Sequence, residues 1–208
     1  MSEPSLTTPL LIVISAPSGG GKTTLCDQLL AKHENITRAV TCTTRKPRAG
    51  EVDGVHYHFL SREDFEDRIA TGQFLEHALV YDNRYGVLES EVVKMMTTGK
   101  HVLLNIDVQG AATVRKEVAS RAALKDRFVS VFLTPASIDA LQKRLLKRGS
   151  ESEATLQRRL DEARVELEQW SAFDYLIIST TVAEDLRRME VILEAELMRQ
   201  ERAEAPLF

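Results

Sequence analysis

Residues 16–24 read Ala16-Pro17-Ser18-Gly19-Gly20-Gly21-Lys22-Thr23-Thr24 and come directly after the apolar run Leu10-Leu11-Ile12-Val13-Ile14 and Ser15. A helical pattern of apolar residues begins at Leu25. A strand that delivers a glycine-rich turn onto a helix N-terminus aims several backbone N–H groups and the positive end of the helix dipole at one point. The stretch therefore predicts a phosphate-binding loop that opens an α/β fold.

Each residue type in this loop suits the binding of a polyphosphate. The three glycines let the backbone wrap closely around phosphate oxygens, Lys22 reaches the β- and γ-phosphates, and the Thr23 hydroxyl is placed to bind Mg²⁺. Ala16 stands where the motif G-x-x-x-x-G-K-[ST] has its first glycine, a change of one methyl group. We therefore expect all nine residues from Ala16 to Thr24 to bind a nucleoside triphosphate.

Length, charge and cysteine content narrow the remaining choices. The chain has 208 residues and a formal net charge of −4, which suits one α/β domain. Its basic residues are dispersed, so neither nucleic acid nor a membrane surface is an expected partner. No apolar run reaches the length of a membrane span and residues 1–9 lack a signal-peptide pattern, so we expect a cytoplasmic protein.

Neither the cysteines nor the histidines predict a metal site. Cys26 and Cys42 form no C-x-x-C pair, so we expect two small buried side chains rather than a disulfide or a zinc ligand set. His56 and His58 would share one face of a strand, but two ligands do not make a site.

Four unbroken apolar runs, at residues 10–14, 102–106, 129–133 and 175–178, predict strands buried on both faces of a parallel sheet. Helical spacing of apolar residues begins near residues 25, 88, 138, 156 and 186. This alternation predicts a parallel sheet flanked by helices, of the kind found in P-loop NTPases.

Two stretches interrupt the alternation. Residues 37–87 hold polar turns and short strand-like pieces at 55–59 and 74–80, which predicts an inserted, mostly β subdomain. The polar break at 147–153, where Ser150 and Glu153 suit a capping box, predicts a small helical lid. We therefore expect one domain over 1–208, with a core of 10–36, 88–146 and 170–200, an insert of 37–87 and a lid of 147–169.

The residues around these interruptions point to phosphoryl transfer. Asp107 follows the strand at 102–106, where a carboxylate can hold Mg²⁺ through water. It also spells D-x-x-G with Gly110, but the chain lacks N-K-x-D and T-K-x-D, which disfavours a GTPase. Arginines occur beside both interruptions, namely Arg45, Arg48, Arg144, Arg148 and Arg159. Because Arg–phosphate hydrogen bonds are strong and orienting, two groups of arginines suit two phosphates.

Several ordered motifs over about residues 10 to 195 resemble those of guanylate kinases. They are Thr41-Cys42-Thr43-Thr44-Arg45-Lys46-Pro47-Arg48-Ala49-Gly50-Glu51-Val52-Asp53-Gly54-Val55-His56-Tyr57, Phe74-Leu75-Glu76, Asn83-Arg84-Tyr85-Gly86, Ile106-Asp107-Val108-Gln109-Gly110 and Arg144-Leu145-Leu146-Lys147-Arg148-Gly149. The resemblance implies a kinase of purine nucleotide metabolism that phosphorylates GMP, and dGMP, with ATP as donor and Mg²⁺ as cofactor.

The resemblance also implies roles for individual residues. It assigns the GMP phosphate to Arg45, Arg48, Tyr57 and Tyr85, and the guanine base to Thr41, Glu76 and Asp107, with Val87 in the same pocket. A carboxylate suits guanine, which presents N1–H and N2–H₂ donors, whereas adenine presents a lone pair at N1 that would repel it.

The same resemblance implies a catalytic set. Arg144, Arg148 and Arg159 would close with the lid over ATP and steady the charge on the transferring phosphoryl group, together with Lys22 and Arg45. The acceptor is a phosphate oxygen that is already largely ionised near pH 7, because its second pKa is about 6. No general base is therefore required, and catalysis reduces to alignment and electrostatic stabilisation.

The sequence departs from the guanylate kinase pattern at three places. Val87 replaces a Ser or Thr whose hydroxyl meets guanine O6, a contact that Thr41 could supply. Asn105 replaces an acidic residue near the Mg²⁺ site, and Ser179-Thr180-Thr181 replaces an Asn-Asp-Asp run near adenine. Two alternatives stay open, namely a kinase of another acceptor such as a ribose bisphosphate and a non-catalytic module that binds a phosphorylated partner. The oligomeric state, a homo-oligomer included, stays open as well.

Overall fold

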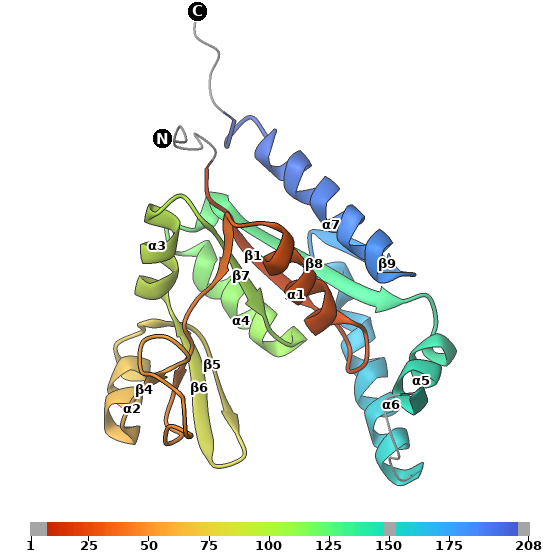
Figure 1. Ribbon diagram of the computed structural model, residues 1–208, viewed down its shortest axis with the longest axis horizontal. Coiled ribbons are helices and arrows are strands. Elements are labelled where there is room, and N and C mark those ends of the chain that lie inside the picture. Colours follow the sequence, from red (N-terminus) through yellow and green to blue (C-terminus); the bar gives the residue numbers. More distant parts are fainter. Residues whose placement is uncertain (1–7, 148–152, 204–208) are drawn as a thin grey trace, which may run out of the picture.

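The structure, a computed structural model, describes residues 8–147 and 153–203 and has a five-stranded parallel sheet at its centre (Figure 1). The strands run in the order β2 (Ile36–Arg38), β7 (His101–Asn105), β1 (Leu11–Ser15), β8 (Phe128–Pro135) and β9 (Tyr175–Ser179). Ile12 of β1 is in register with Leu103 of β7 and Val129 of β8. The phosphate-loop sequence therefore leaves the sheet from its middle strand.

Helices cover both faces of this sheet. One face carries α1 (Lys22–Lys32) and α7 (Val182–Leu197), and the other carries α3 (Glu89–Thr97) and α4 (Val108–Ala119). In β1, Ile12 and Ile14 belong to the hydrophobic cluster with α1 and α7, whereas Leu11 and Val13 belong to the cluster with α3 and α4. Burial on both faces explains the unbroken apolar runs, and the predicted α/β architecture is confirmed.

Strand β9 differs from the prediction that all four apolar runs are buried on both faces. It pairs with β8 at the sheet edge, and α7 packs on one of its faces through Ile177. Leu176 and Ile178 point the other way and are 41% and 36% exposed. The expectation that residues 175–178 are buried on both faces is therefore wrong, because an edge strand with one covered face can carry an unbroken apolar run.

The insert holds a second sheet, which we call the β arm (residues 42–88). Its strands run in the order β4 (His58–Phe59), β3 (Cys42–Thr43), β6 (Asn83–Leu88) and β5 (Phe74–Val80). Helix α2 (Arg62–Ala70) packs its Phe65 against Phe74, with the ring centroids 4.4 Å apart. Both cysteines are buried and free, as the sequence predicts.

The strand-like piece at 55–59 shrinks to β4, so the expectation that His56 and His58 share a strand face is wrong. His56 lies in the preceding turn, where its Nδ1 accepts a hydrogen bond from the Val52 N–H at 3.0 Å. His58 instead lies with its Nε2 at 3.6 Å from a Glu91 carboxylate oxygen.

A second projection, which we call the helical arm, consists of α5 (Ile138–Lys147) and α6 (Glu153–Leu167). Leu141 and Leu145 of α5 pack against Leu160 and Ala163 of α6. Arg148 and the Ser150 half of the expected capping box lie outside the described residues. Short 3₁₀ helices occur at Lys125–Arg127 and Glu168–Ala172. The two arms extend from the same side of the central sheet (Figure 1), and none of the described helices is long and apolar enough to cross a bilayer.

Candidate nucleotide site

The glycine-rich loop has the backbone shape that an anion site needs. Gly19 and Gly21 have φ angles of +85° and +105°, in the left-handed region that favours glycine. A Cβ on Gly20 would lie 2.9 Å from the Pro17 carbonyl oxygen. Helix α1 begins at Lys22 with Gly21 as its N-cap and with no side-chain capping bond. Its first N–H groups, and the positive end of its dipole, are therefore left for a ligand.

Lys22 crosses from this loop to the end of the neighbouring strand β7. Its Nζ donates a hydrogen bond to the Ile106 carbonyl oxygen at 2.6 Å. Burial lowers the pKa of Lys22, and the nearby Asp107 carboxylate opposes that shift. The Lys22 ammonium group is thus held beside the loop by the Ile106 carbonyl oxygen, close to the negative charge of Asp107.

A cavity of about 280 Å³ lies over the loop and contains oxygen ligands suited to Mg²⁺. It is lined by residues 16–23 with Asp107 and Glu166. Asp107 is the N-cap of α4, and its Oδ1 accepts a hydrogen bond from the Gly110 N–H at 2.7 Å. The structure thus brings Thr23 and Asp107, the two predicted metal ligands, to one cavity. Hydroxyl and carboxylate oxygens are the donors that Mg²⁺ prefers.

Glu166 is a site residue that the sequence analysis missed. It comes from α6 of the helical arm, and its Oε2 accepts a hydrogen bond from the Ser18 N–H of the loop at 3.2 Å. Burial is the main reason why the pKa of Glu166 is raised. The Glu166 carboxylate therefore accepts a hydrogen bond from a loop N–H group that the sequence predicts will bind phosphate.

Arg144 is a predicted helical-arm arginine that the structure brings to the loop. Its Nη1 donates to the Gly20 carbonyl oxygen at 3.1 Å, and its Nη2 donates to Ser179 Oγ at 3.0 Å. Together with Gly19, Gly21 and Thr24, it lines a cavity of about 400 Å³ on the α7 side of the loop. Arg159 lies half-buried on α6.

The predicted phosphate ligands of the acceptor gather on the β arm. Arg45 donates two hydrogen bonds to Glu51, at 2.9 and 2.8 Å, and its guanidinium lies 5.3 Å from the centre of the Tyr57 ring. The ring of Tyr85 is 6.2 Å from that of Tyr57. Arg48 is exposed and donates its backbone N–H to Glu51 at 2.7 Å.

Glu51 is a second residue that received no role from the sequence. Hydrogen bonds from the Arg45 side chain, and then from the Arg48 N–H, lower the pKa of Glu51 to about 2. Its carboxylate therefore stays ionised and holds the Arg45 guanidinium in place through two hydrogen bonds.

Glu76 lies where the β arm meets the core. Burial, and then the Asp107 carboxylate, raises the pKa of Glu76 to about 7. Gly110 of α4 leaves room for it, since a Cβ there would lie 3.3 Å from Glu76 Cγ. Val87 is the direct cross-strand partner of Glu76, yet it is 5% exposed and packs in the hydrophobic core. Thr41 is half-buried just before β3.

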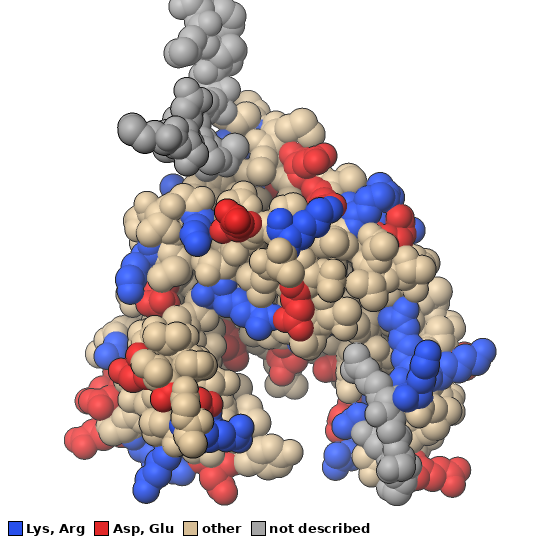
Figure 2. All heavy atoms as spheres, in the orientation of Figure 1, with Lys and Arg blue, Asp and Glu red and all other residues tan. Residues whose placement is uncertain are grey.

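The two groups of residues are linked near Asp107, which lines the loop cavity and whose charge acts on Glu76 of the β arm. Figure 2 shows the hollow between the β arm and the helical arm, open to solvent below the central sheet. The loop and Lys22 belong to the core, Arg144 reaches the loop from the helical arm, and Arg45, Tyr57 and Tyr85 belong to the β arm. The arrangement can hold two anionic ligands that approach each other.

Comparisons with known proteins agree with this geometry. The chain matches the family described as guanylate kinase over residues 8–196. It is 44% identical over 199 residues to a guanylate kinase of Clostridium perfringens, covering 96% of this chain and 89% of that protein. It is 45% identical over 182 residues to a guanylate kinase of Neisseria meningitidis, covering 86% and 85%.

Among solved structures, the crystal structure of a guanylate kinase from Anaplasma phagocytophilum superposes with a TM-score of 0.66. The two chains are 31% identical, and the match covers 95% of this chain and 92% of that one. The similarity therefore extends over both arms as well as the central sheet.

Proposed function

Because the chain belongs to the guanylate kinase family, we propose that it transfers the γ-phosphoryl group of ATP to GMP, giving ADP and GDP, and that it accepts dGMP as well. One observation carries the proposal for the site itself. The loop cavity with Lys22 also contains Asp107, whose charge acts on the half-buried carboxylate of Glu76 at the base of the β arm, and the same arm carries the arginine and tyrosine cluster. The loop with Lys22 suits the donor nucleotide, and the β-arm residues with Glu76 suit an acceptor that carries guanine.

The proposed mechanism is alignment with electrostatic stabilisation. The loop N–H groups and Lys22 hold the β- and γ-phosphates of ATP, and Arg45, Arg48, Tyr57 and Tyr85 hold the phosphate of GMP. A phosphate oxygen of GMP attacks the γ-phosphorus in line as the bond to the ADP oxygen breaks. Arg144, with Arg148 and Arg159, stabilises the charge on the transferring group. The acceptor is already ionised near pH 7, so no side chain removes a proton from it.

We propose Mg²⁺ as the cofactor. Thr23 and, through water, Asp107 would hold it beside the phosphates, and both line the loop cavity. The described residues include no group of three His, Cys, Asp or Glu side chains suited to a metal, which fits an ion held mostly by nucleotide oxygens and water. When bound, Mg²⁺ neutralises charge on the phosphates.

The proposed partners are the small-molecule substrates, in place of nucleic acid or a membrane surface. Figure 2 shows both acidic and basic side chains on the visible face. The substrates are nucleotides of the cytoplasm, which is the compartment that we propose for the protein.

A coupled ADP-release assay tests the acceptor. We expect turnover with GMP and dGMP and little with AMP, UMP or ribose 1,5-bisphosphate. Equal rates with GMP and AMP would refute the guanine assignment, and turnover with the bisphosphate alone would favour the related kinase of another acceptor. Binding of GMP without any ADP release would favour a non-catalytic module.

The variant Lys22→Ala tests the donor site. It removes the ammonium group that is tethered to the Ile106 carbonyl oxygen, so we expect loss of phosphoryl transfer with GMP binding retained. Lys32→Ala provides a matched control, since Lys32 lies at the other end of α1 and pairs with Glu190 on α7. Unchanged turnover in Lys22→Ala would contradict the assignment.

A further inference from the structure

A buried carboxylate on α7 lies beside the donor cavity and has no role in the mechanism above. Asp185 is 6% exposed and lines the cavity that also contains Gly19, Gly21 and Arg144. Its Oδ2 accepts a hydrogen bond from Ser179 Oγ at 2.6 Å, and its Oδ1 accepts one from the Thr180 N–H at 3.0 Å. A buried carboxylate is costly unless its oxygens are paired, and here each oxygen is.

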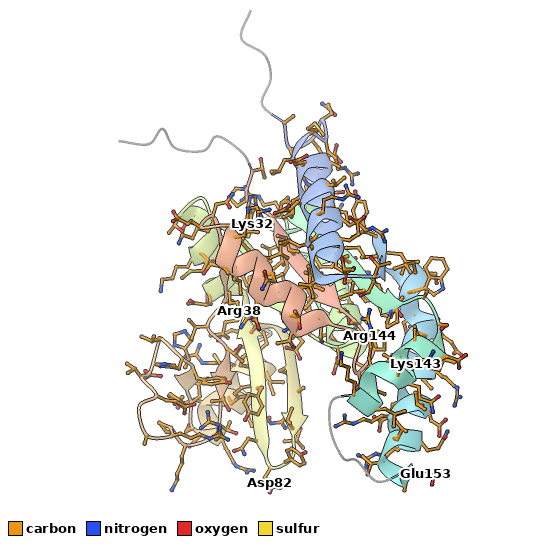
Figure 3. The ribbon with its side chains drawn as sticks, turned by 45° about the vertical axis from the view of Figure 1, so that its right-hand side comes forward. Lys32, Arg38, Asp82, Lys143, Arg144 and Glu153 are labelled. Atoms are coloured by element: carbon orange, nitrogen blue, oxygen red, sulfur yellow. The ribbon has the colours of Figure 1, made fainter. Side chains whose placement is uncertain are left out.

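The hydrogen bonds continue from Asp185 to Arg144. Because the Ser179 hydroxyl donates its only proton to Asp185, its lone pairs are free to accept from Arg144 Nη2, which lies 3.0 Å away. Nη1 of the same guanidinium donates to the Gly20 carbonyl oxygen at 3.1 Å. Figure 3 shows Arg144 at the inner end of α5, beside the start of α1.

This chain of bonds fixes the direction of the Ser179 hydroxyl. A serine can donate or accept, but the carboxylate of Asp185 can only accept, so the hydroxyl must present its oxygen to the arginine. The negative charge of Asp185 also polarises the hydroxyl toward the positive guanidinium. The sequence Ser179-Thr180-Thr181 contains no carboxylate of its own, and Asp185, one helical turn further along, supplies one.

We infer that Asp185 is a positioning residue, which holds the Arg144 guanidinium against the phosphate loop through Ser179. The inference rests on the proposed function, since Arg144 is there the arginine that stabilises the transferring phosphoryl group. Two of the guanidinium donors are held by Gly20 and Ser179, and the remaining N–H groups keep a fixed direction at the cavity. Such a preset direction matters because a displacement of about 1 Å can cost about 100-fold in rate.

The variant Asp185→Asn tests this inference. Asparagine has the same shape but only one acceptor oxygen. Because the Thr180 N–H binds that oxygen, the amide NH₂ faces Ser179 Oγ, and the hydroxyl can no longer donate there. We expect kcat to fall by about 10- to 100-fold, with KM for GMP unchanged. Glu194→Gln on the exposed side of the same helix is the matched control and should leave kcat unchanged.

A cycle with Arg144→Ala separates positioning from a general structural role. If Asp185 acts through Arg144, Asp185→Asn should have no further effect on kcat in the Arg144→Ala background. Ser179→Ala should lower kcat to the same extent, because it removes the hydroxyl that links Asp185 to Arg144. If Asp185→Asn lowers the melting temperature, Ser179→Ala still tests the same series of hydrogen bonds. An equal fall of kcat in both backgrounds, or no fall in either single variant, would overturn the inference.

A spectroscopic readout keeps this test independent of the proposed reaction. The side-chain Nε–H signal of Arg144 in the protein without nucleotide, assigned by its loss in Arg144→Lys, reports how firmly the guanidinium is held. We expect the signal to broaden or shift in Asp185→Asn and Ser179→Ala and to stay unchanged in Glu194→Gln. An unchanged signal in the first two variants contradicts positioning, whereas failure to phosphorylate GMP contradicts only the proposed function.

Discussion

Glu76 combines a shifted pKa with a role that depends on charge. Burial and the Asp107 carboxylate raise its pKa to about 7, so near neutrality the side chain exists in both protonation states. Only the ionised form can accept both N–H donors of guanine, and a protonated carboxyl replaces one acceptor with a donor. The affinity of the free enzyme for GMP should therefore rise as pH rises through about 7.

We expect kcat/KM for GMP to increase from pH 6 to pH 8, which initial rates at subsaturating GMP will measure. The second ionisation of the GMP phosphate, with a pKa of about 6, contributes to the same slope. Glu76→Gln removes the protein part only, so it should flatten the profile above pH 7 and reduce the preference for GMP over AMP. A profile unchanged by Glu76→Gln would contradict the role of this carboxylate.

A variant of Val87, on the strand next to Glu76, tests whether this position belongs to the acceptor pocket. It is paired directly with Glu76 but is packed in the core. Val87→Thr is nearly isosteric and adds a hydroxyl; if the hydroxyl reaches guanine O6, KM for GMP should fall about 5- to 10-fold, as expected for a hydrogen bond of about 1 kcal/mol. If it stays in the core, the melting temperature falls and KM does not change, which would remove Val87 from the predicted GMP pocket.

Local sequence predicted some site residues and could not predict others. Lys22 and Thr23 stand in a short motif whose geometry follows from adjacent residues, so the sequence was sufficient to propose them. Glu166 contacts Ser18 from 148 positions away, and Asp185 lies in an ordinary amphipathic helix. No local pattern marks such contacts, because the fold alone brings those residues to the loop.

At the scale of elements, the helical arm contacts the loop of the proposed donor site. The α6 carboxylate of Glu166 accepts the Ser18 N–H, so it competes with a phosphate oxygen for that donor. We expect Glu166→Gln, which has no negative charge, to lower KM for ATP several-fold, since hydrogen bonds to charged groups are stronger by about 1 kcal/mol. Steady-state kinetics with ATP varied at saturating GMP will measure the effect.

Glu162→Gln, one helical turn away on α6 and exposed, is the control for Glu166→Gln. Because burial raises the pKa of Glu166, its carboxylate takes up a proton at higher pH than an ordinary glutamate. KM for ATP in the unaltered protein should therefore fall on acidification, and this part of the pH dependence should be absent from Glu166→Gln. A higher KM in Glu166→Gln would mean that Glu166 assists the donor site rather than competing there.

The elements themselves were predicted unevenly, for physical reasons. The three inner strand runs, at residues 10–14, 102–106 and 129–133, were recognisable because burial on both faces demands unbroken apolar sequence. Helices α2 and α4 were missed, although Ser61 and Asp107 cap them through the Asp64 and Gly110 N–H groups. Strand β2 was missed because three residues at a sheet edge leave too short a pattern.

At the scale of the whole molecule, the two arms stand apart while their functional residues belong to one proposed reaction. Arg45 is on the β arm and Arg144 on the helical arm, and the groove between them is open (Figure 2). Transfer requires both substrates within reach of each other and sheltered from water, which would otherwise accept the phosphoryl group. The arms must therefore approach each other when both sites are filled.

Spin labels at the tips of the arms test this closure. Asp82, in the turn of the β5–β6 hairpin, and Glu153, at the start of α6, are both exposed and can be replaced by cysteine (Figure 3). Cys26 and Cys42 are buried, which favours labelling of the introduced thiols. We expect the label distance to shorten by more than about 2 Å when GMP and a non-hydrolysable ATP analogue are added together, and by less with either alone. Labels at Lys32 and Glu194, on two helices of one core face, should show no change, and an unchanged tip distance with both ligands bound would mean that transfer occurs without closure of the arms.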